Sequence, residues 1–186
     1  MRLNAVSYYA DFFLSAAAIL ILTVQMSAHV GVFQAVQLIA WVVAGFIAWT
    51  VLEYFVHRVL YHNVPYFKEL HDAHHAEPNA FVGAPPVIAL ILIFALTYVP
   101  VATVSALAAS GLTIGMLVGY MAYMVLHHAA HYWKLPTNSW LYRARRHHAL
   151  HHHHHVEGNY GVTTGFWDRV FGTALESSGL PRLKLR

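Results

Sequence analysis

The stretch FFLSAAAILILTVQMSAHVGVFQAVQLIAWVVAGFIAWTVL, residues 12–52, contains no Asp, Glu, Lys or Arg. A second uncharged stretch runs from residue 78 to residue 133. A helix that crosses ~30 Å of hydrocarbon needs ~20 apolar residues, so each stretch is long enough for two crossings joined by a turn. The two stretches therefore predict an all-α integral membrane protein with four transmembrane helices.

The four spans are expected at about residues 12–28, 32–56, 87–108 and 112–126. Glycine and serine are common in turns, so Gly31 should join the first two spans and Ser110–Gly111 the last two. Pro100 lacks a backbone N–H and should kink the third span. The 186 residues are expected to form a single domain, 1–186, because the tail, 134–186, is too short for a core of its own.

The composition excludes several classes of protein. Charged residues make up 10% of the chain, whereas ordinary soluble domains have about 25%. A soluble enzyme and a nucleic-acid binder are therefore excluded, and the absence of cysteine excludes disulfides and thiolate ligands. All 11 Lys and Arg residues lie outside the two uncharged stretches. By the positive-inside rule, both termini and the segment between the stretches should face the cytoplasm.

Histidine is the unusual residue, with 16 copies against eight for Asp and Glu together. Residues at i, i+3 and i+4 share a helix face, so a triplet with that spacing can aim three imidazoles at one point. A pair five residues apart needs a frayed helix end or a π-bulge to share a face. Ten histidines form four such groups beside the predicted cytoplasmic face: His57 and His62; His71, His74 and His75; His127 and His131; His148, His151 and His152.

Ten imidazoles exceed the coordination sphere of one metal ion, whereas two ions can take about five each. Neutral imidazole suits iron, copper, zinc or nickel rather than magnesium or calcium. The groups therefore predict a two-metal centre in a cytoplasmic, histidine-rich cap. Metal-bound imidazoles usually donate their other N–H to an acceptor. The candidates for such a supporting role are Glu53, Asp72, Glu77, Glu157 and Asp168.

The last histidine group can be aligned in two registers. His151, His154 and His155 repeat the spacing of His148, His151 and His152, so His155 is either a supporting residue or an alternative ligand. His29, in the predicted outer turn, has no neighbour with ligand spacing and is not expected to bind metal.

These groups belong to a longer pattern that resembles the integral-membrane fatty acid hydroxylase superfamily, which also contains sterol desaturases and oxidases. The pattern includes WTVLEYFVHRVLYH at 49–62, HDAHHAEPN at 71–79 and the histidine region from residue 148. It covers about two thirds of the chain. GVT at 161–163 and FWDRVFGT at 166–173 are most similar to the tail of sphingolipid-type fatty acid 2-hydroxylases.

The resemblance implies a centre of two iron ions held by histidine alone, which uses O2 and two electrons to hydroxylate a lipid C–H bond. The implied substrate is a long acyl chain, free or in a sphingolipid-like molecule, and zinc can replace iron in purified protein. Relatives often carry a fused haem electron-donor domain, which this sequence does not contain, so a separate donor protein is expected. The distance from His148 to Gly161 favours the register that begins at His148.

Two positions depart from the family pattern: Tyr132 stands where a second histidine is common, and Asn159 where glycine is usual. Two other functions remain open. A sterol or carotenoid hydroxylase or desaturase would use the same centre. A zinc-binding membrane protein or metal transporter would use the histidines without O2, but transporters place ionisable ligands near the membrane midplane rather than at one face.

Overall fold

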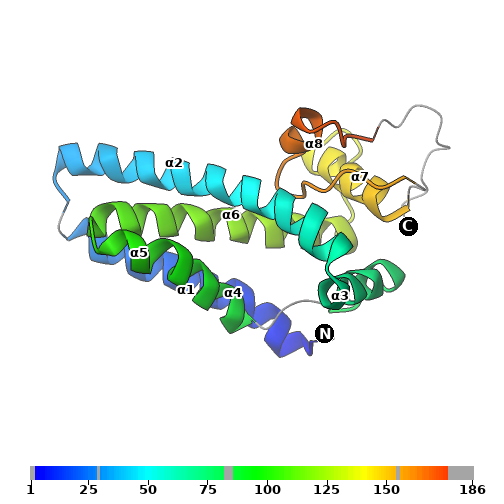
Figure 1. The fold of residues 1–186 in the computed structure, drawn as a ribbon, viewed down its shortest axis with the longest axis horizontal. Coiled ribbons are helices and arrows are strands. Elements are labelled where there is room, and N and C mark those ends of the chain that lie inside the picture. The colour runs from blue at the N-terminus through cyan, green and yellow to red at the C-terminus, as the bar shows by residue number, and fades with distance from the viewer. Residues whose placement is uncertain (1–2, 29, 82–85, 154–155, 176–186) are drawn as a thin grey trace.

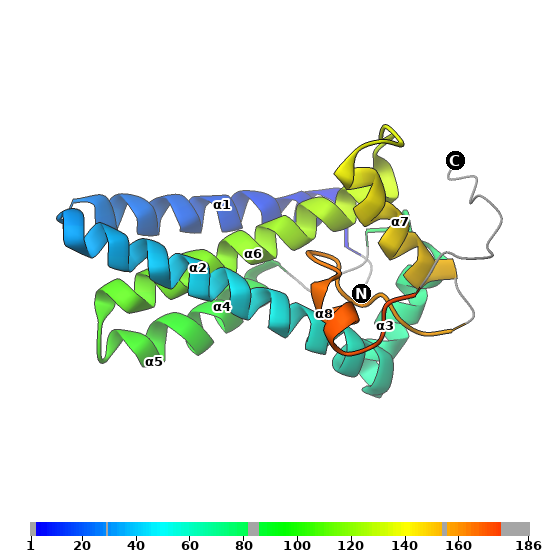
Figure 2. The same cartoon turned by 90° about the horizontal axis from the view of Figure 1, so that it is seen from above.

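The computed structural model describes residues 3–28, 30–81, 86–153 and 156–175. Every regular element within these residues is a helix, which confirms the all-α prediction. The long helices run along one another, and the short helices α3, α7 and α8 gather at one end (Figures 1 and 2). An elongated apolar bundle therefore carries a cap at one end.

Three helical segments are long and apolar enough to cross a membrane: α1 (Ala5–Ser27), α2 (Val32–Phe55) with its π-helical continuation η1 (Val56–Tyr61), and α6 (Ala106–Tyr132). A shorter apolar segment consists of α4 (Pro86–Ile93), the π-helical η2 (Phe94–Tyr98) and α5 (Val99–Ala102). Helices of this length and hydropathy are typical of membrane proteins.

The first predicted turn is confirmed and the second is wrong. Gly31 caps α2, and its N–H donates to Gln34 Oε1 at 2.8 Å. The second turn lies at Thr103–Ser105, where the Ser105 hydroxyl caps α6 by accepting from the Ala108 N–H at 3.2 Å. The third apolar segment therefore ends at Ala102 rather than residue 108, and α6 begins at Ala106 rather than residue 112.

Ser110 and Gly111 are small because α6 packs closely against α2, and both are buried inside α6. The same face of α6 carries Gly115, where an added Cβ would lie 2.1 Å from the Val42 carbonyl oxygen. Small residues at four-residue spacing let helix backbones approach closely in membranes. Ser110 and Gly111 are residue types that are common in turns, but here they lie inside a helix and allow it to pack closely.

Pro100 lies in α5, directly after η2. Proline cannot donate the hydrogen bond of a regular helix, and π-helical segments often accompany such breaks in α-helical bonding. The third apolar segment is therefore irregular where the sequence predicts a kink.

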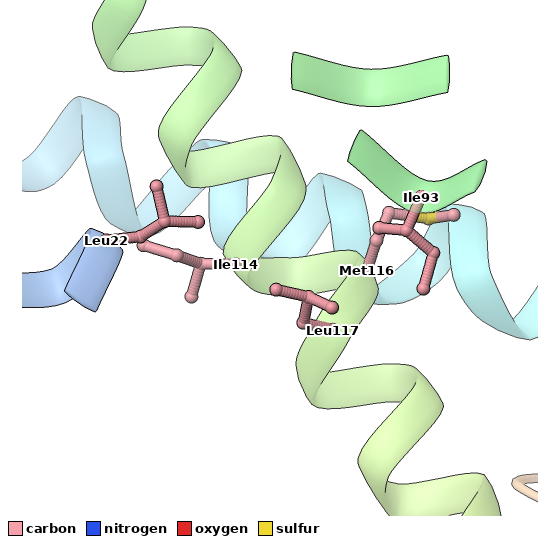
Figure 3. Packing of buried hydrophobic residues seen from close by; sticks show 5 residues of the cluster. All are labelled: Leu22, Ile93, Ile114, Met116 and Leu117. Atoms are coloured by element: carbon pink, nitrogen blue, oxygen red, sulfur yellow. The ribbon is translucent and has the colours of Figure 1, made fainter. Parts of the chain in front are cut away.

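Helix α6 is the centre of the bundle. Its Ile114, Met116 and Leu117 pack with Leu22 of α1 and Ile93 of α4 in the buried hydrophobic core (Figure 3). Two polar contacts also join α6 to its neighbours, one to α1 and one to η2. Tyr120 Oη donates to Asp11 Oδ2 at 2.5 Å, and the hydroxyls of Thr97 and Thr113 lie 2.8 Å apart.

Candidate metal centre

All ten predicted histidines come together at the cap end of the bundle. They lie on η1, α3 (Pro65–Ala76), α6 and α7 (Trp140–His153), with His62 directly after η1. The five-histidine cluster contains His74, His127, His131, His148 and His152. The four-histidine cluster contains His57, His62, His71 and His151. His75 adjoins the second cluster, because its Nε2 lies 2.9 Å from His71 Nε2 and 3.1 Å from His151 Nε2.

The triplets are divided between the clusters, so the prediction that each aims at one point is wrong. In α7, His148 and His152 belong to the five-histidine cluster and His151 to the four-histidine cluster. In α3, His71 and His75 stay together while His74 joins the other cluster. Residues i and i+4 differ by about 40° around a helix and residues i and i+3 by about 60° in the opposite direction. Each helix therefore lies between the two clusters and supplies both.

His57 and His62 share a cluster, as predicted for a helix with a π-bulge. The segment Val56–Tyr61, which contains His57 and ends directly before His62, is π-helical. In a π-helix the bonds run from i to i+5, so residues five apart return to the same face.

The distances between ring nitrogens fit a metal ion. In the four-histidine cluster, His57 Nε2 lies 3.1 Å from His71 Nε2 and 2.9 Å from His151 Nε2. In the five-histidine cluster, His131 Nε2 lies 3.2 Å from His127 Nε2 and 3.0 Å from His148 Nε2. A metal–imidazole bond is about 2.0–2.1 Å long, so two nitrogens bound to one ion at 90–110° are roughly 2.9–3.4 Å apart.

The outer nitrogens of two rings show which atoms are free to bind metal. His57 Nδ1 donates to the Tyr160 carbonyl oxygen, and His151 Nδ1 donates to the Gly158 carbonyl oxygen at 2.8 Å. A carbonyl can only accept, so each Nδ1 carries the proton and each Nε2 presents a lone pair. These two lone pairs face one another at 2.9 Å. A shared proton or a metal ion between them would make this arrangement favourable, and the low pKa of His151 favours the metal ion.

Three cluster histidines outside the long helices are held in the neutral form. Burial, with the neighbouring imidazoles, lowers the pKa of His74 to about 3 and that of His75 to about 4. Burial also lowers the pKa of His151 to about 3, against the opposing effect of its bond to Gly158. Neutral imidazole is the form that binds metal ions.

Two of the five acidic candidates organise the loop that supplies these carbonyls. The position of Glu53 one turn before His57 predicts a histidine or Arg58 as its partner, but among the described residues its buried carboxylate accepts instead from the backbone N–H groups of Val162 and Thr163. Asp168, fully buried in α8 (Phe166–Val170), accepts from the N–H groups of Tyr160 and Gly161. Both carboxylates therefore act on the backbone behind the rings rather than on the rings themselves.

The other acidic candidates lie nearer the surface. Asp72 is exposed and binds Lys68 at 2.6 Å rather than an imidazole. Glu77 is exposed at the end of α3. Glu157 is also exposed, but one of its oxygens lies 3.7 Å from His62 Nδ1. His29 and His155 lie outside the described residues, as does His154 of the second register.

The roles of Gly158 and Tyr160 are not predicted by the sequence, because a backbone carbonyl acceptor leaves no trace in residue type. The two departures from the family pattern have structural explanations. Asn159 has φ 54°, in the left-handed region where glycine and asparagine are best tolerated. Tyr132 stacks on His128 and donates to the Asn79 carbonyl oxygen, so it lies beside the clusters rather than in them.

The chain is thus an all-helical protein with long apolar helices and histidine clusters that can hold metal ions. The profile of the fatty acid hydroxylase family matches residues 42–173, and the chain belongs to that family.

Three relatives illustrate the similarity. Fatty acid 2-hydroxylase of Rattus norvegicus is 29% identical over 156 residues, which cover 76% of this chain and 41% of the relative. The ceramide very long chain fatty acid hydroxylase scs7 of Schizosaccharomyces pombe is 32% identical over 151 residues, with 73% and 42% covered. Dihydroceramide fatty acyl 2-hydroxylase FAH2 of Arabidopsis thaliana is 30% identical over 139 residues, with 69% and 58% covered. The chain therefore spans less than two thirds of the length of each.

The fold is similar to that of a solved structure. Full-length scs7p, of which only the hydroxylase domain is visible, superposes with a TM-score of 0.78 at 24% identity. The similarity covers 93% of this chain and 70% of that one.

Proposed function

We propose that the protein is an O2-dependent hydroxylase that acts on a C–H bond of a long acyl chain, in a fatty acid or a sphingolipid-like molecule. The observation that carries the proposal is the pair His57 and His151, whose lone-pair nitrogens face each other at 2.9 Å within a group of ten histidines. Membership of the fatty acid hydroxylase family supports the reaction class.

The ten histidines would hold two metal ions, iron in the active protein and zinc where it has exchanged. The four-histidine cluster with His75 would hold one ion, and the five-histidine cluster the other. Bound iron would supply the oxidation of an unactivated C–H bond, which amino-acid side chains cannot perform. A separate donor protein would supply the electrons.

The chain itself would fix the ligands and exclude water. His57, His148 and His151 are buried. The carbonyl groups of Gly158 and Tyr160 fix the orientation of two rings. A buried set of pre-oriented ligands needs little rearrangement when a metal ion binds.

We further propose four membrane crossings, with the cap and both termini on the cytoplasmic side. The shorter segment, Val87–Ala102, would be the fourth crossing. The positive-inside rule supports this orientation, because no Lys or Arg lies in the turns at Gly31 and Thr103–Ser105. Reporter fusions at Gly31 and Val104 should both report the outer side; two cytoplasmic signals would overturn the topology.

The acyl substrate is argued from the shape of the bundle and from the relatives. Helices that end at a polar cap suit a lipid whose head group stays at the interface while its tail lies among them. Each CH2 group removed from water contributes about 0.8 kcal/mol, so a long tail can bind without a polar pocket. The similar proteins from rat, fission yeast and Arabidopsis are named for fatty acids, ceramide and dihydroceramide.

The decisive experiment compares the lipids of cells that express the protein with those of cells that express His127→Ala. The wild type should produce acyl lipids heavier by one oxygen atom, and the variant should not. Metal analysis of the purified wild type should give two ions per chain. Unchanged lipids together with one ion or fewer in well-loaded protein would overturn the proposal.

A further inference from the structure

The outer nitrogens of the two clusters have different surroundings. In the four-histidine cluster, the Nδ1 atoms of His57 and His151 both donate to backbone carbonyl groups. In the five-histidine cluster, the Nδ1 atoms of His74, His148 and His152 are buried and have no hydrogen-bond partner among the described residues. The chain therefore fixes the rings of one cluster more firmly than those of the other.

Both carbonyl groups belong to one short loop. Gly158 and Tyr160 lie two residues apart, between the end of α7 and the start of α8. Asn159, between them, holds the turn in the left-handed conformation, and its side chain donates to the His147 carbonyl oxygen at 3.0 Å. Any displacement of this loop would move His57 and His151 together.

Two buried carboxylates anchor consecutive parts of the loop, Asp168 at residues 160–161 and Glu53 at residues 162–163. Asp168 accepts from Tyr160 N at 2.8 Å and Gly161 N at 2.9 Å. Glu53 accepts from the next two N–H groups, at 3.1 Å in the case of Thr163. Four consecutive peptide groups are thus bound by two acids that come from α2 and α8.

The anchor is rigid because each carboxylate oxygen of Asp168 has two hydrogen-bond partners. Thr173 Oγ1 also donates to its Oδ1 at 2.8 Å, and His147 Nε2 lies 3.1 Å from its Oδ2. Charge-assisted hydrogen bonds of this kind are stronger than neutral ones. An amide in place of either carboxylate would direct an NH2 group at a backbone donor.

We infer that Glu53 and Asp168 are positioning residues that set the metal affinity of one site only, the site formed by the four-histidine cluster and His75. The inference rests on the two-metal function proposed above. Neither carboxylate contacts a ligand ring; both act through the carbonyl groups of Gly158 and Tyr160. The five-histidine site, whose rings have no such support from the loop, is independent of them and binds its ion less firmly in the wild type.

Zinc titration of metal-free, detergent-purified full-length protein against a competing chelator tests the inference. The wild type should bind two ions with unequal affinity. Glu53→Gln and Asp168→Asn should weaken one of the two sites by about 10–100-fold, the usual effect of removing an outer hydrogen-bond partner. The matched control is Asp72→Asn, an exposed acid on ligand-bearing α3, which should leave both affinities unchanged.

Second-site variants identify the weakened site. In a His152→Ala background only the four-histidine site remains intact, and Glu53→Gln should weaken it. In a His71→Ala background the five-histidine site remains, and Glu53→Gln should leave it unchanged. Equal weakening in both backgrounds, or none in either, would overturn the inference.

Folding and the underlying function are separated by two further measurements. Should Asp168→Asn fail to fold, Thr173→Val removes one hydrogen bond of Asp168, together with the 3.0 Å contact between Thr173 Oγ1 and Tyr54 Oη, and should weaken the same site to a smaller extent. Thr173→Val without effect on zinc affinity, in a folded protein, would then count against the inference. A wild type that binds fewer than two ions would refute the two-metal proposal, and the inference that rests on it would then fail as well. Two bound ions with unequal effects of the variants would test the inference by itself.

Discussion

His57 and His62, five residues apart, belong to the same histidine cluster because the helix that carries them is π-helical from Val56 to Tyr61. In a regular α-helix five residues turn the chain by about 500°, which leaves the second ring about 140° away from the first. The wider π-helical turn reduces this difference and brings the two rings towards the same side. It follows α2 without a break, at the point where the apolar helix meets the cap.

His62→Ala is therefore expected to act on the same ion as His57→Ala. Each variant should lower the metal content of purified protein from two ions per chain towards one, and the double variant should lose no more than either alone. Metal analysis with protein quantification measures this. His153→Ala is the control, since His153 is exposed on the same helix as three ligands and should keep both ions. Loss of both ions in His62→Ala would refute the assignment to separate clusters.

Removal of metal should destabilise the protein. An ion that binds only the folded chain stabilises it by about 2.7 kcal/mol at a hundredfold excess over its dissociation constant. Chelation should therefore lower the melting temperature in detergent, and added zinc should restore it. His152→Ala, with one cluster disrupted, should show a smaller decrease than the wild type. A melting temperature that does not respond to chelator would contradict the presence of structural metal.

The sequence allows the helical architecture and the ten histidines to be predicted, because both depend on local patterns. Uncharged stretches mark apolar helices, and the five-residue spacing of His57 and His62 requires a frayed or distorted helix if both rings bind the same centre. The division of each histidine triplet between two clusters cannot be predicted from a local pattern, because it depends on how the helices pack. His74 and His151 join different clusters from their nearest neighbours because α3 and α7 each lie between the two.

The sequence does not predict the turn at Thr103–Ser105, for a related reason. Small residues allow both tight turns and close helix packing, and only the position of α2 distinguishes them. Gly111 lies against Trp41, where an added Cβ would be 2.6 Å from the Trp41 Cβ atom. The sequence marks Glu53 and Asp168 as candidates for a supporting role, but their partners are backbone N–H groups that no side-chain pattern reveals.

Gly115→Leu should disrupt the bundle. The new side chain would begin 2.1 Å from the Val42 carbonyl oxygen and 2.7 Å from the Phe46 nitrogen, both backbone atoms that cannot move independently. Overpacking of this kind typically costs about 1–3 kcal/mol and occasionally more. Thermal unfolding in detergent should show a clear decrease for Gly115→Leu. Val118→Leu, an exposed position on the same helix, should be close to wild type, and equal effects in the two variants would contradict the packing.

Tyr120→Phe should destabilise the contact between α1 and α6. The phenol hydroxyl is the hydrogen-bond donor to Asp11 Oδ2, and the other Asp11 oxygen is buried without a hydrogen-bond partner among the described residues. Loss of one partner from a buried polar pair costs about 1–3 kcal/mol, whereas removal of both can be nearly neutral. Adding Asp11→Leu to Tyr120→Phe should therefore recover part of the lost stability. A double variant less stable than Tyr120→Phe would show that Asp11 has another stabilising role.

The substrate class can be tested directly on the protein in a membrane. Membrane-embedded protein is supplied with O2, a reducing system and one of three labelled lipids: a long-chain ceramide, the free fatty acid or a carotenoid. We expect oxygen in the acyl chain, near the carbonyl group, because a lipid anchored by its head group at the cap would bring that part of the chain closest to the histidines. His127→Ala is the inactive control, since that ring lies in the five-histidine cluster. Oxygen incorporated only into the carotenoid would refute the acyl substrate while leaving the two-metal oxygenase intact.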